Sequence, residues 1–207
     1  LRTDAVQAQN LLSGPCDPQA SAWTLINVTA TGNDATAPDD SETAATLRET
    51  TDSGTHGLSQ DATKSAESQT LTGSVYVQAD GRDRVRLSLM SGANGARATF
   101  RLDTGVVSTA AATTGSGWSG ASAAIVDVGG GWYRLSLTAT TDSTTTATLV
   151  IDLDNGSGTS YAGNASLGVL LWGAQVEEAV SAGLLLVPEM LPDTVTGEGV
   201  VPGYVVE

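Results

Sequence analysis

Apolar residues recur at every second position in several separate runs of this sequence. In the clearest run Leu71, Val75 and Val77 share one phase of the alternation, and Thr72 and Tyr76 share the other. Successive side chains of a β-strand point to opposite faces, so each run predicts a half-buried strand. Parallel strands are usually apolar on both faces, and the one-sided pattern therefore favours antiparallel pairing. The predicted strands span residues 71–79, 84–89, 98–102, 133–139 and 147–153.

Residues that tolerate a positive φ stand between these runs. Asp80 with Gly81, the three glycines at 129–131, and Asp154 with Asn155 and Gly156 are typical of tight turns. No segment shows sustained helical periodicity. Short strands with turn signals at this spacing predict an all-β fold, a two-sheet antiparallel β-sandwich.

The charge and the rare residue types exclude several classes of protein. The 207 residues include 23 acidic and 9 basic ones and carry a net charge of -14, whereas nucleic-acid binding needs clustered Lys and Arg. No apolar run approaches the roughly 20 residues of a membrane helix. The lone Cys16 excludes an internal disulfide framework. The lone His56 is expected at the surface or at an interface, and it leaves little material for metal or acid–base chemistry.

The chain changes character near its C-terminal end, where prolines and glycines interrupt an apolar tail. Two interpretations stay open: the tail folds back over its own sandwich, or it is an extended arm that docks on a neighbouring subunit. We divide the chain into a lead-in or attachment segment (1–9), a sandwich domain (10–182) and an arm (183–207). The candidate attachment residues are Leu184, Leu185, Leu186, Val187, Val200, Val201 and Tyr204.

Four segments of the chain are distinctive: residues 10–12 with 21–24, 73–79, 125–138 and 172–178. They resemble segments of carbohydrate-binding-module-like jelly-roll domains of tailed-phage virion surface proteins. The resemblance covers about residues 10–182 and keeps the order of the segments. It implies a concanavalin-like or galactose-binding-like jelly roll on a virion surface, and it leaves the ligand open because a fold does not fix a function.

Two aromatic residues are candidates for stacking on a sugar. Trp118 and Tyr161 lie in polar segments with neighbouring glycines and no strand pattern, and loops often carry binding residues. The remaining aromatic candidates, Trp23, Trp132, Tyr133 and Trp172, are expected in the core.

Arginines on the polar phase of predicted strands form a second candidate site. If their strands are neighbours, Arg84, Arg86, Arg101 and Arg134 make a cationic stripe, which could bind an acidic glycan or the acidic surface of another copy. The alternative is a solvated face with ordinary cross-strand ion pairs. Of these arginines, Arg84 and Arg86 join Trp118 and Tyr161 as the glycan-binding candidates.

No catalytic residue is predicted. Nothing singles out a pair of carboxylates for glycoside hydrolysis among the acidic residues, and Cys16 has no evident activating partner. Asp152 and Asp154 are candidate ligands for a structural calcium ion, which the family resemblance favours, and a plain hairpin turn is the alternative.

These observations favour a non-enzymatic phage structural protein, a capsid decoration or head-fibre subunit on the virion surface that helps host-surface adsorption. The alternative is a glycan-binding tail-fibre or receptor-binding adhesin module. The expected partners are the phage capsid or other virion proteins, further copies of the chain in a homo-oligomer, and host surface polysaccharide. Neither nucleic-acid binding nor membrane insertion is expected.

Overall fold

The computed structural model describes residues 9–14 and 18–183, and this part of the chain is built from strands without a helix. It accordingly holds no helix that could cross a membrane. The candidate arm residues, Leu184 to Val187, Val200, Val201 and Tyr204, lie outside the described residues, as do residues 1–8 and Cys16.

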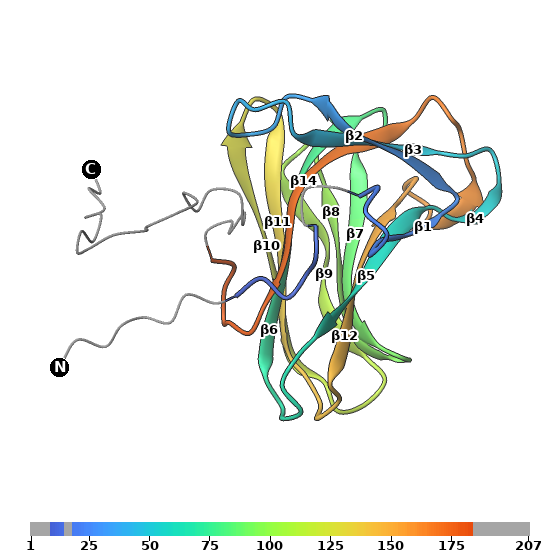
Figure 1. Ribbon diagram of the computed structural model, residues 1–207. Helices are drawn as coiled ribbons and strands as arrows, with labels where there is room; N and C mark the ends of the chain where they lie inside the picture. The colour runs from blue at the N-terminus through green and yellow to red at the C-terminus, as the bar shows by residue number, and fades with distance from the viewer. Residues whose placement is uncertain (1–8, 15–17, 184–207) are drawn as a thin grey trace, which may run out of the picture.

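Two six-stranded antiparallel sheets face each other (Figure 1). In spatial order, sheet A contains β1 (Thr24–Ile26), β5 (Gly57–Thr63), β12 (Thr146–Leu153), β7 (Arg84–Ser91), β8 (Asn94–Arg101) and β9 (Val106–Thr114). Sheet B contains β10 (Ser119–Gly129), β11 (Trp132–Thr140), β6 (Thr70–Asp80), β14 (Gly168–Glu177), β3 (Ala44–Glu49) and β2 (Val28–Ala35). A small third sheet pairs β13 (Ser160–Ala162) with β4 (Ser53–Thr55).

The chain crosses repeatedly between the two large sheets, as in double-sheet jelly rolls. The five strands predicted from the alternation are present as β6, β7, β8, β11 and β12. The predicted all-β, two-sheet antiparallel sandwich is therefore confirmed.

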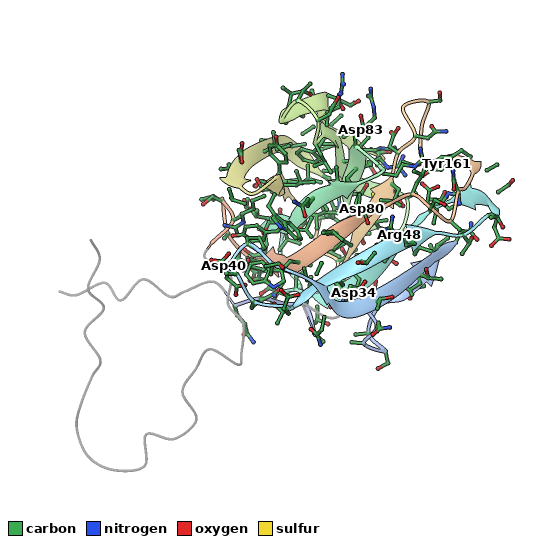
Figure 2. All side chains as sticks on the ribbon, turned by 90° about the horizontal axis from the view of Figure 1, so that it is seen from above. Asp34, Asp40, Arg48, Asp80, Asp83 and Tyr161 are labelled. Atoms are coloured by element: carbon green, nitrogen blue, oxygen red, sulfur yellow. The ribbon has the colours of Figure 1, made fainter. Side chains whose placement is uncertain are left out.

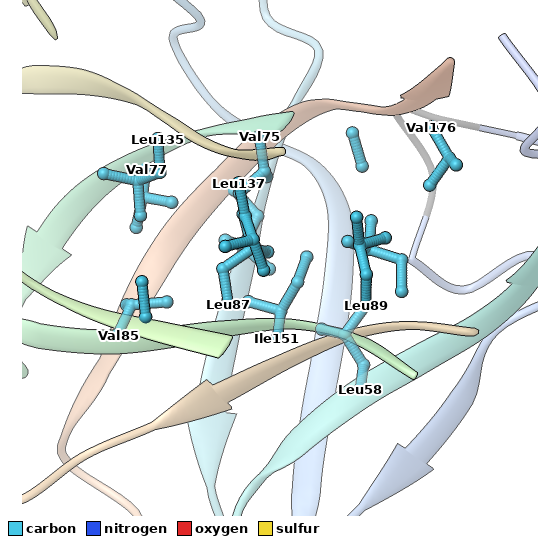
Figure 3. Packing of buried hydrophobic residues seen from close by; sticks show 14 of the residues in the cluster. Leu58, Val75, Val77, Val85, Leu87, Leu89, Leu135, Leu137, Ile151 and Val176 are labelled. Atoms are coloured by element: carbon cyan, nitrogen blue, oxygen red, sulfur yellow. The ribbon is translucent and has the colours of Figure 1, made fainter. Parts of the chain in front are cut away.

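The main core lies between the sheets and consists of the apolar phase of each strand (Figure 3). Leu87 and Leu89 of β7 face Val75 of β6 and Leu137 of β11 from the opposite layer, and all four side chains are buried. Each fully buried side chain of this size stabilises the fold by roughly 1.5–3 kcal/mol relative to an exposed one. Gly73 interrupts the apolar phase because a Cβ there would come within 3.0 Å of Leu89 and of Leu149.

A second, smaller apolar cluster lies on the outer face of sheet B. Tyr133 and Val77 are cross-strand partners that point inward, so Trp132 and Gln78, one position along, point outward. Trp132 packs there with Trp172, Ala37 and Ala44 under the connection between β2 and β3. The expected burial of Trp23, Trp132 and Trp172 is confirmed, and Tyr133 packs half-buried against the main core.

Candidate functional site

Trp118 lies in the loop between β9 and β10, as expected, but its side chain is buried rather than open to solvent. Its side chain is 6% exposed and packs into the main core. Gly115 and Gly117 have φ values of 71° and 82°, which let the chain turn sharply from β9 into β10. The turn brings the indole over the end of the core, where burial of a large apolar ring outweighs its polar neighbours in the sequence. The ring therefore presents no free face to a sugar.

Tyr161 has its ring and its hydroxyl occupied by protein groups. The ring stacks on His56 with 4.6 Å between the centroids, and the guanidinium carbon of Arg82 lies 5.0 Å from the Tyr161 centroid. The hydroxyl donates a 2.6 Å hydrogen bond to Oε1 of Glu49. Burial, together with this hydrogen bond, raises the pKa of the Tyr161 hydroxyl above its usual range. His56 is fully buried, which corrects the expected surface position.

Glu49 is the centre of this buried polar cluster, which the sequence analysis missed. Arg82 donates to both carboxylate oxygens, at 2.5 and 3.0 Å, and the backbone N–H of Asn164 donates at 2.8 Å. Burial alone would raise the pKa of Glu49, but the hydrogen bonds from Arg82, Tyr161 and Asn164 hold it below its usual range. The carboxylate is 1% exposed, so the cluster closes one end of the sandwich and offers no open site.

The arginines form a shorter row than predicted. Arg84 and Arg86 lie on the outer face of sheet A, and Arg84 stands directly opposite Arg101. Arg134 belongs to the other sheet, where it donates hydrogen bonds to Ser74, Gln175 and the carbonyl oxygen of Gly183.

Acidic side chains accompany the arginines of this row. Both Nε and Nη2 of Arg86 donate to Oδ2 of Asp152, at 3.2 and 2.6 Å. Arg101 pairs with Asp103, and Nε of Arg84 lies 4.0 Å from Oδ1 of Asp83. The outer face of sheet A therefore carries cross-strand and neighbouring ion pairs, of which the Arg86–Asp152 pair has a buried carboxylate and the other two are partly exposed.

The two calcium candidates are engaged separately. Asp152 pairs with Arg86, and burial raises the pKa of Asp152 despite that partner. Oδ1 of Asp154 accepts the backbone N–H of Gly156 at 2.6 Å, which is the side-chain bond of a tight turn. Within residues 9–14 and 18–183, no three His, Cys, Asp or Glu side chains gather as a metal site would require.

A hollow of about 360 Å³ opens on the outer face of sheet B beside Trp132. One wall is the β2–β3 connection, and the other is the end of β10 with its turn into β11. Gln78 of β6 and Trp132 of β11, which are cross-strand partners, contribute from the sheet below. The lining residues are Thr36, Ala37, Pro38, Asp40, Gln78, Val128, Gly129, Gly130 and Trp132.

The β2–β3 wall is held in shape by its own hydrogen bonds. The backbone N–H of Ala37 donates to the carbonyl oxygen of Ser41 at 2.7 Å, and that of Asp40 donates to Ala37 at 3.0 Å. Asp40 adopts a φ of 65°, a conformation that non-glycine residues adopt rarely and that concentrates at functional sites. The carboxylate of Asp40 has no hydrogen bond or ion pair with any residue in the described part of the chain.

The buried Glu49 cluster and the hollow are separate sites. Figure 2, seen from above, shows Asp40 and Tyr161 well apart, with Asp34 of β2 on the side of Asp40. The buried Glu49 cluster belongs to the side of Tyr161, and the hollow belongs to the side of Asp40. The hollow combines small apolar groups, an edge of the largely buried Trp132, an amide and one carboxylate, which suits a small polar ligand with apolar faces.

Comparisons with known proteins give similarities of structure. The chain matches the enzymatically active domain of tailspike protein 4 from bacteriophage CBA120 at 14% identity and a TM-score of 0.48, covering 82% of this chain and 21% of that one. It matches TmCBM61, solved with β-1,4-galactotriose, at 11% identity and a TM-score of 0.47, covering 83% and 99%. A Bacteroides thetaiotaomicron VPI-5482 protein named for sugar binding matches at 11% identity and a TM-score of 0.44, covering 84% and 96%.

No family model and no curated protein matches the sequence. The chain spans about a fifth of the length of the tailspike structure. At these identities the function of the chain rests on its own residues.

Proposed function

We propose that this chain is a non-enzymatic saccharide-binding module of a phage particle protein, and that its ligand site is the hollow beside Trp132. The hollow itself carries the proposal, because a volume of about 360 Å³ falls within the roughly 300–1,000 Å³ of small-molecule sites. The phage setting rests on the four sequence segments that resemble virion surface domains.

The lining suits an uncharged sugar. A pyranose ring has C–H faces that pack on apolar groups and hydroxyl edges that need hydrogen-bond partners. Pro38 and Val128 supply most of the apolar part, because Trp132 is only 4% exposed and contributes little more than an edge, while Asp40 and the amide of Gln78 supply polar groups. Since Asp40 is the one charged residue of this lining, the hollow favours neutral saccharides over acidic ones.

The same lining supports binding without hydrolysis. Glycoside hydrolases generally use two carboxyl groups, roughly 5 to 9.5 Å apart, one on each side of the scissile bond. The hollow contains a single carboxylate, that of Asp40, and no Lys, His or Cys lines it. Its residues can therefore hold a sugar but do not make up such a pair.

The capsid decoration or head-fibre role, with a homo-oligomer on the virion surface, remains a further part of the proposal. It depends on the apolar segments at 184–187 and 200–204, which lie outside the described residues. Removal of residues 184–207 should abolish occupancy of phage particles that lack the native protein. Unchanged occupancy would remove this role and leave the saccharide site unaffected.

The saccharide site is tested by blocking the hollow. Val128 lines it and is 40% exposed, so Val128→Trp fills the space without disturbing the core. Val106→Trp is the matched control, because Val106 is similarly exposed on β9 of the other sheet. Purified wild-type protein should bind immobilised neutral host polysaccharide saturably, Val106→Trp should bind equally, and Val128→Trp should lose binding. Equal binding by all three proteins would overturn the proposed site.

A further inference from the structure

Among residues 9–14 and 18–183, the two large sheets end in edge strands that pair with one neighbouring strand each. Sheet A ends in β1 and β9, and sheet B ends in β10 and β2. A free edge presents a row of N–H and C=O groups that another strand can pair with. Proteins normally protect such edges by keeping them short, by bulges or by charged residues, so an unprotected edge identifies a surface that pairs.

Three of these edges are protected. β1 has only three residues. β2 pairs regularly with β3 only from Val28 to Thr31, and then contains Asn33 with a φ of 51° and the charged Asp34. β9 has two register shifts in its pairing with β8, one on each side of Thr99. Each of these features interrupts the regular spacing that an added strand would need.

β10 lacks this protection over its central part. Ser122 to Asp127 pair with β11 without interruption, and the register shifts lie only at the two ends of that stretch. Asp127 is its one charged residue, and the stretch contains neither proline nor glycine. Val126, near the middle of the strand, leaves 55% of its side chain exposed. An exposed, regular and nearly uncharged edge of this kind is a pairing site.

We propose that β10 pairs antiparallel with β10 of a second copy of this chain, about a two-fold axis at Ala124. Antiparallel partners must point to the same face, so the axis passes through a residue rather than between two residues. In this register the cross-strand pairs between the two copies are Val126 with Ser122, Ala123 with Ile125, and Asp127 with Ala121. The two sheets B then form one continuous sheet across a self-complementary interface.

The net charge of the chain also favours contact between two copies through β10. Two copies that each carry a net charge of -14 repel one another, and contact is least costly where a strand carries almost no charge. Screening this repulsion should strengthen the dimer. The screening length falls from about 30 Å at 0.01 M salt to about 8 Å at 0.15 M, so the dimer fraction of the full chain should rise over that range.

A symmetric cross-link tests the register. Ala124→Cys in a Cys16→Ser background places two thiols opposite each other on the axis, where the Cα atoms are about 4.5–5.5 Å apart and within disulfide reach. Ala110→Cys is the matched control, because Ala110 is exposed on the edge strand β9 as Ala124 is on β10. Under mild oxidation Ala124→Cys should form covalent dimers at least about tenfold faster, because the pre-formed pair has a high local thiol concentration.

A second variant keeps the test independent of cysteine chemistry. Val126→Lys adds a charge to the edge and should weaken the dimer in sedimentation, whereas Val106→Lys on β9 should leave it unchanged. Cross-linking no faster than that of Ala110→Cys would overturn the proposal. A chain that sediments as a monomer at every salt and protein concentration would do the same.

Discussion

The side-chain amide of Gln78 donates a 2.5 Å hydrogen bond to the carbonyl oxygen of Gly130 and so ties β6 to the β10–β11 turn. That turn contains three consecutive glycines with φ values of 90°, 61° and 83°. Residues with a side chain rarely adopt this conformation. The backbone of the turn and the amide of Gln78 together shape one wall of the hollow.

Alanine substitutions in this turn should differ according to position. Gly131→Ala adds a Cβ 2.9 Å from Nε2 of Gln78, whereas a Cβ at Gly129 meets nothing within 4 Å. Both substitutions place a side chain at a positive φ, which costs roughly 1–2 kcal/mol of stability. We expect Gly131→Ala to lose more stability than Gly129→Ala in chemical denaturation, and also to weaken saccharide binding. Equal losses would mean that the Gln78 contact does not hold the turn.

The buried ion pair should matter far more than an exposed one. Arg82→Ala leaves the carboxylate of Glu49 buried without its cation, and the loss of one partner of a buried pair costs about 3–5 kcal/mol. Arg48→Ala is the control, because Arg48 and its partner Asp80 are each about one-third exposed. Such a pair contributes roughly 0–1 kcal/mol. Denaturant unfolding of both variants measures the difference, and similar losses would contradict the assignment of Glu49 to a buried cluster.

The pH dependence of stability should reveal the ionised state of Glu49. Its folded-state pKa lies below the ordinary value of 4.5, so ionised Glu49 stabilises the fold above that pH. This stabilisation is lost as the pH falls through the folded-state pKa. Wild type should therefore be more stable than Glu49→Gln near neutral pH, and the difference in unfolding free energy should shrink below about pH 4.5. A difference that is constant across this range would show that Glu49 is not ionised in the fold.

The contribution of Glu177 to the free energy of unfolding should change with pH in the opposite direction. Burial raises its pKa above 4.5, despite the hydrogen bond from the N–H of Gly183 and the charge of Arg134. A carboxyl group with a raised folded-state pKa costs stability when ionised, and this cost disappears as the pH falls through that pKa. Glu177→Gln keeps an oxygen acceptor for Gly183, so it should be at least as stable as wild type at neutral pH. As the pH falls, wild type should gain stability relative to Glu177→Gln. A loss of stability relative to this variant would refute the assignment.

Sequence could predict those strands in which apolar and polar residues alternate clearly. In β6, β7 and β12 apolar residues such as Val75, Leu87 and Ile151 alternate with polar ones, and burial of one face follows directly. β9 consists of Val, Ser, Thr and Ala, so its two phases hardly differ and it was not predicted. The glycines around Trp118 indicated a loop correctly but gave no sign that the indole would be buried.

The two polar sites required tertiary structure. Glu49 shares the apolar phase of β3 with Ala45 and Leu47, which was a usable signal of its burial. Its partners are 33 and 112 residues away in the chain, at Arg82 and Tyr161, and no local pattern joins them. The hollow likewise assembles residues of three separate segments. Trp132 was correctly expected to be buried, but its place on the outer face depended on how the sheets pair.

Titration of isotope-labelled protein with a neutral oligosaccharide, followed by NMR, tests whether the saccharide binds in the hollow beside Trp132. Binding there should shift the Trp132 indole N–H and the Gly129 and Gly130 amides saturably, since these groups adjoin the hollow. The indole signals of Trp23 and Trp118, which are buried in the main core, should stay in place. Shifts confined to Arg84 and Arg86 on sheet A would contradict the account and place the saccharide on the arginine row instead.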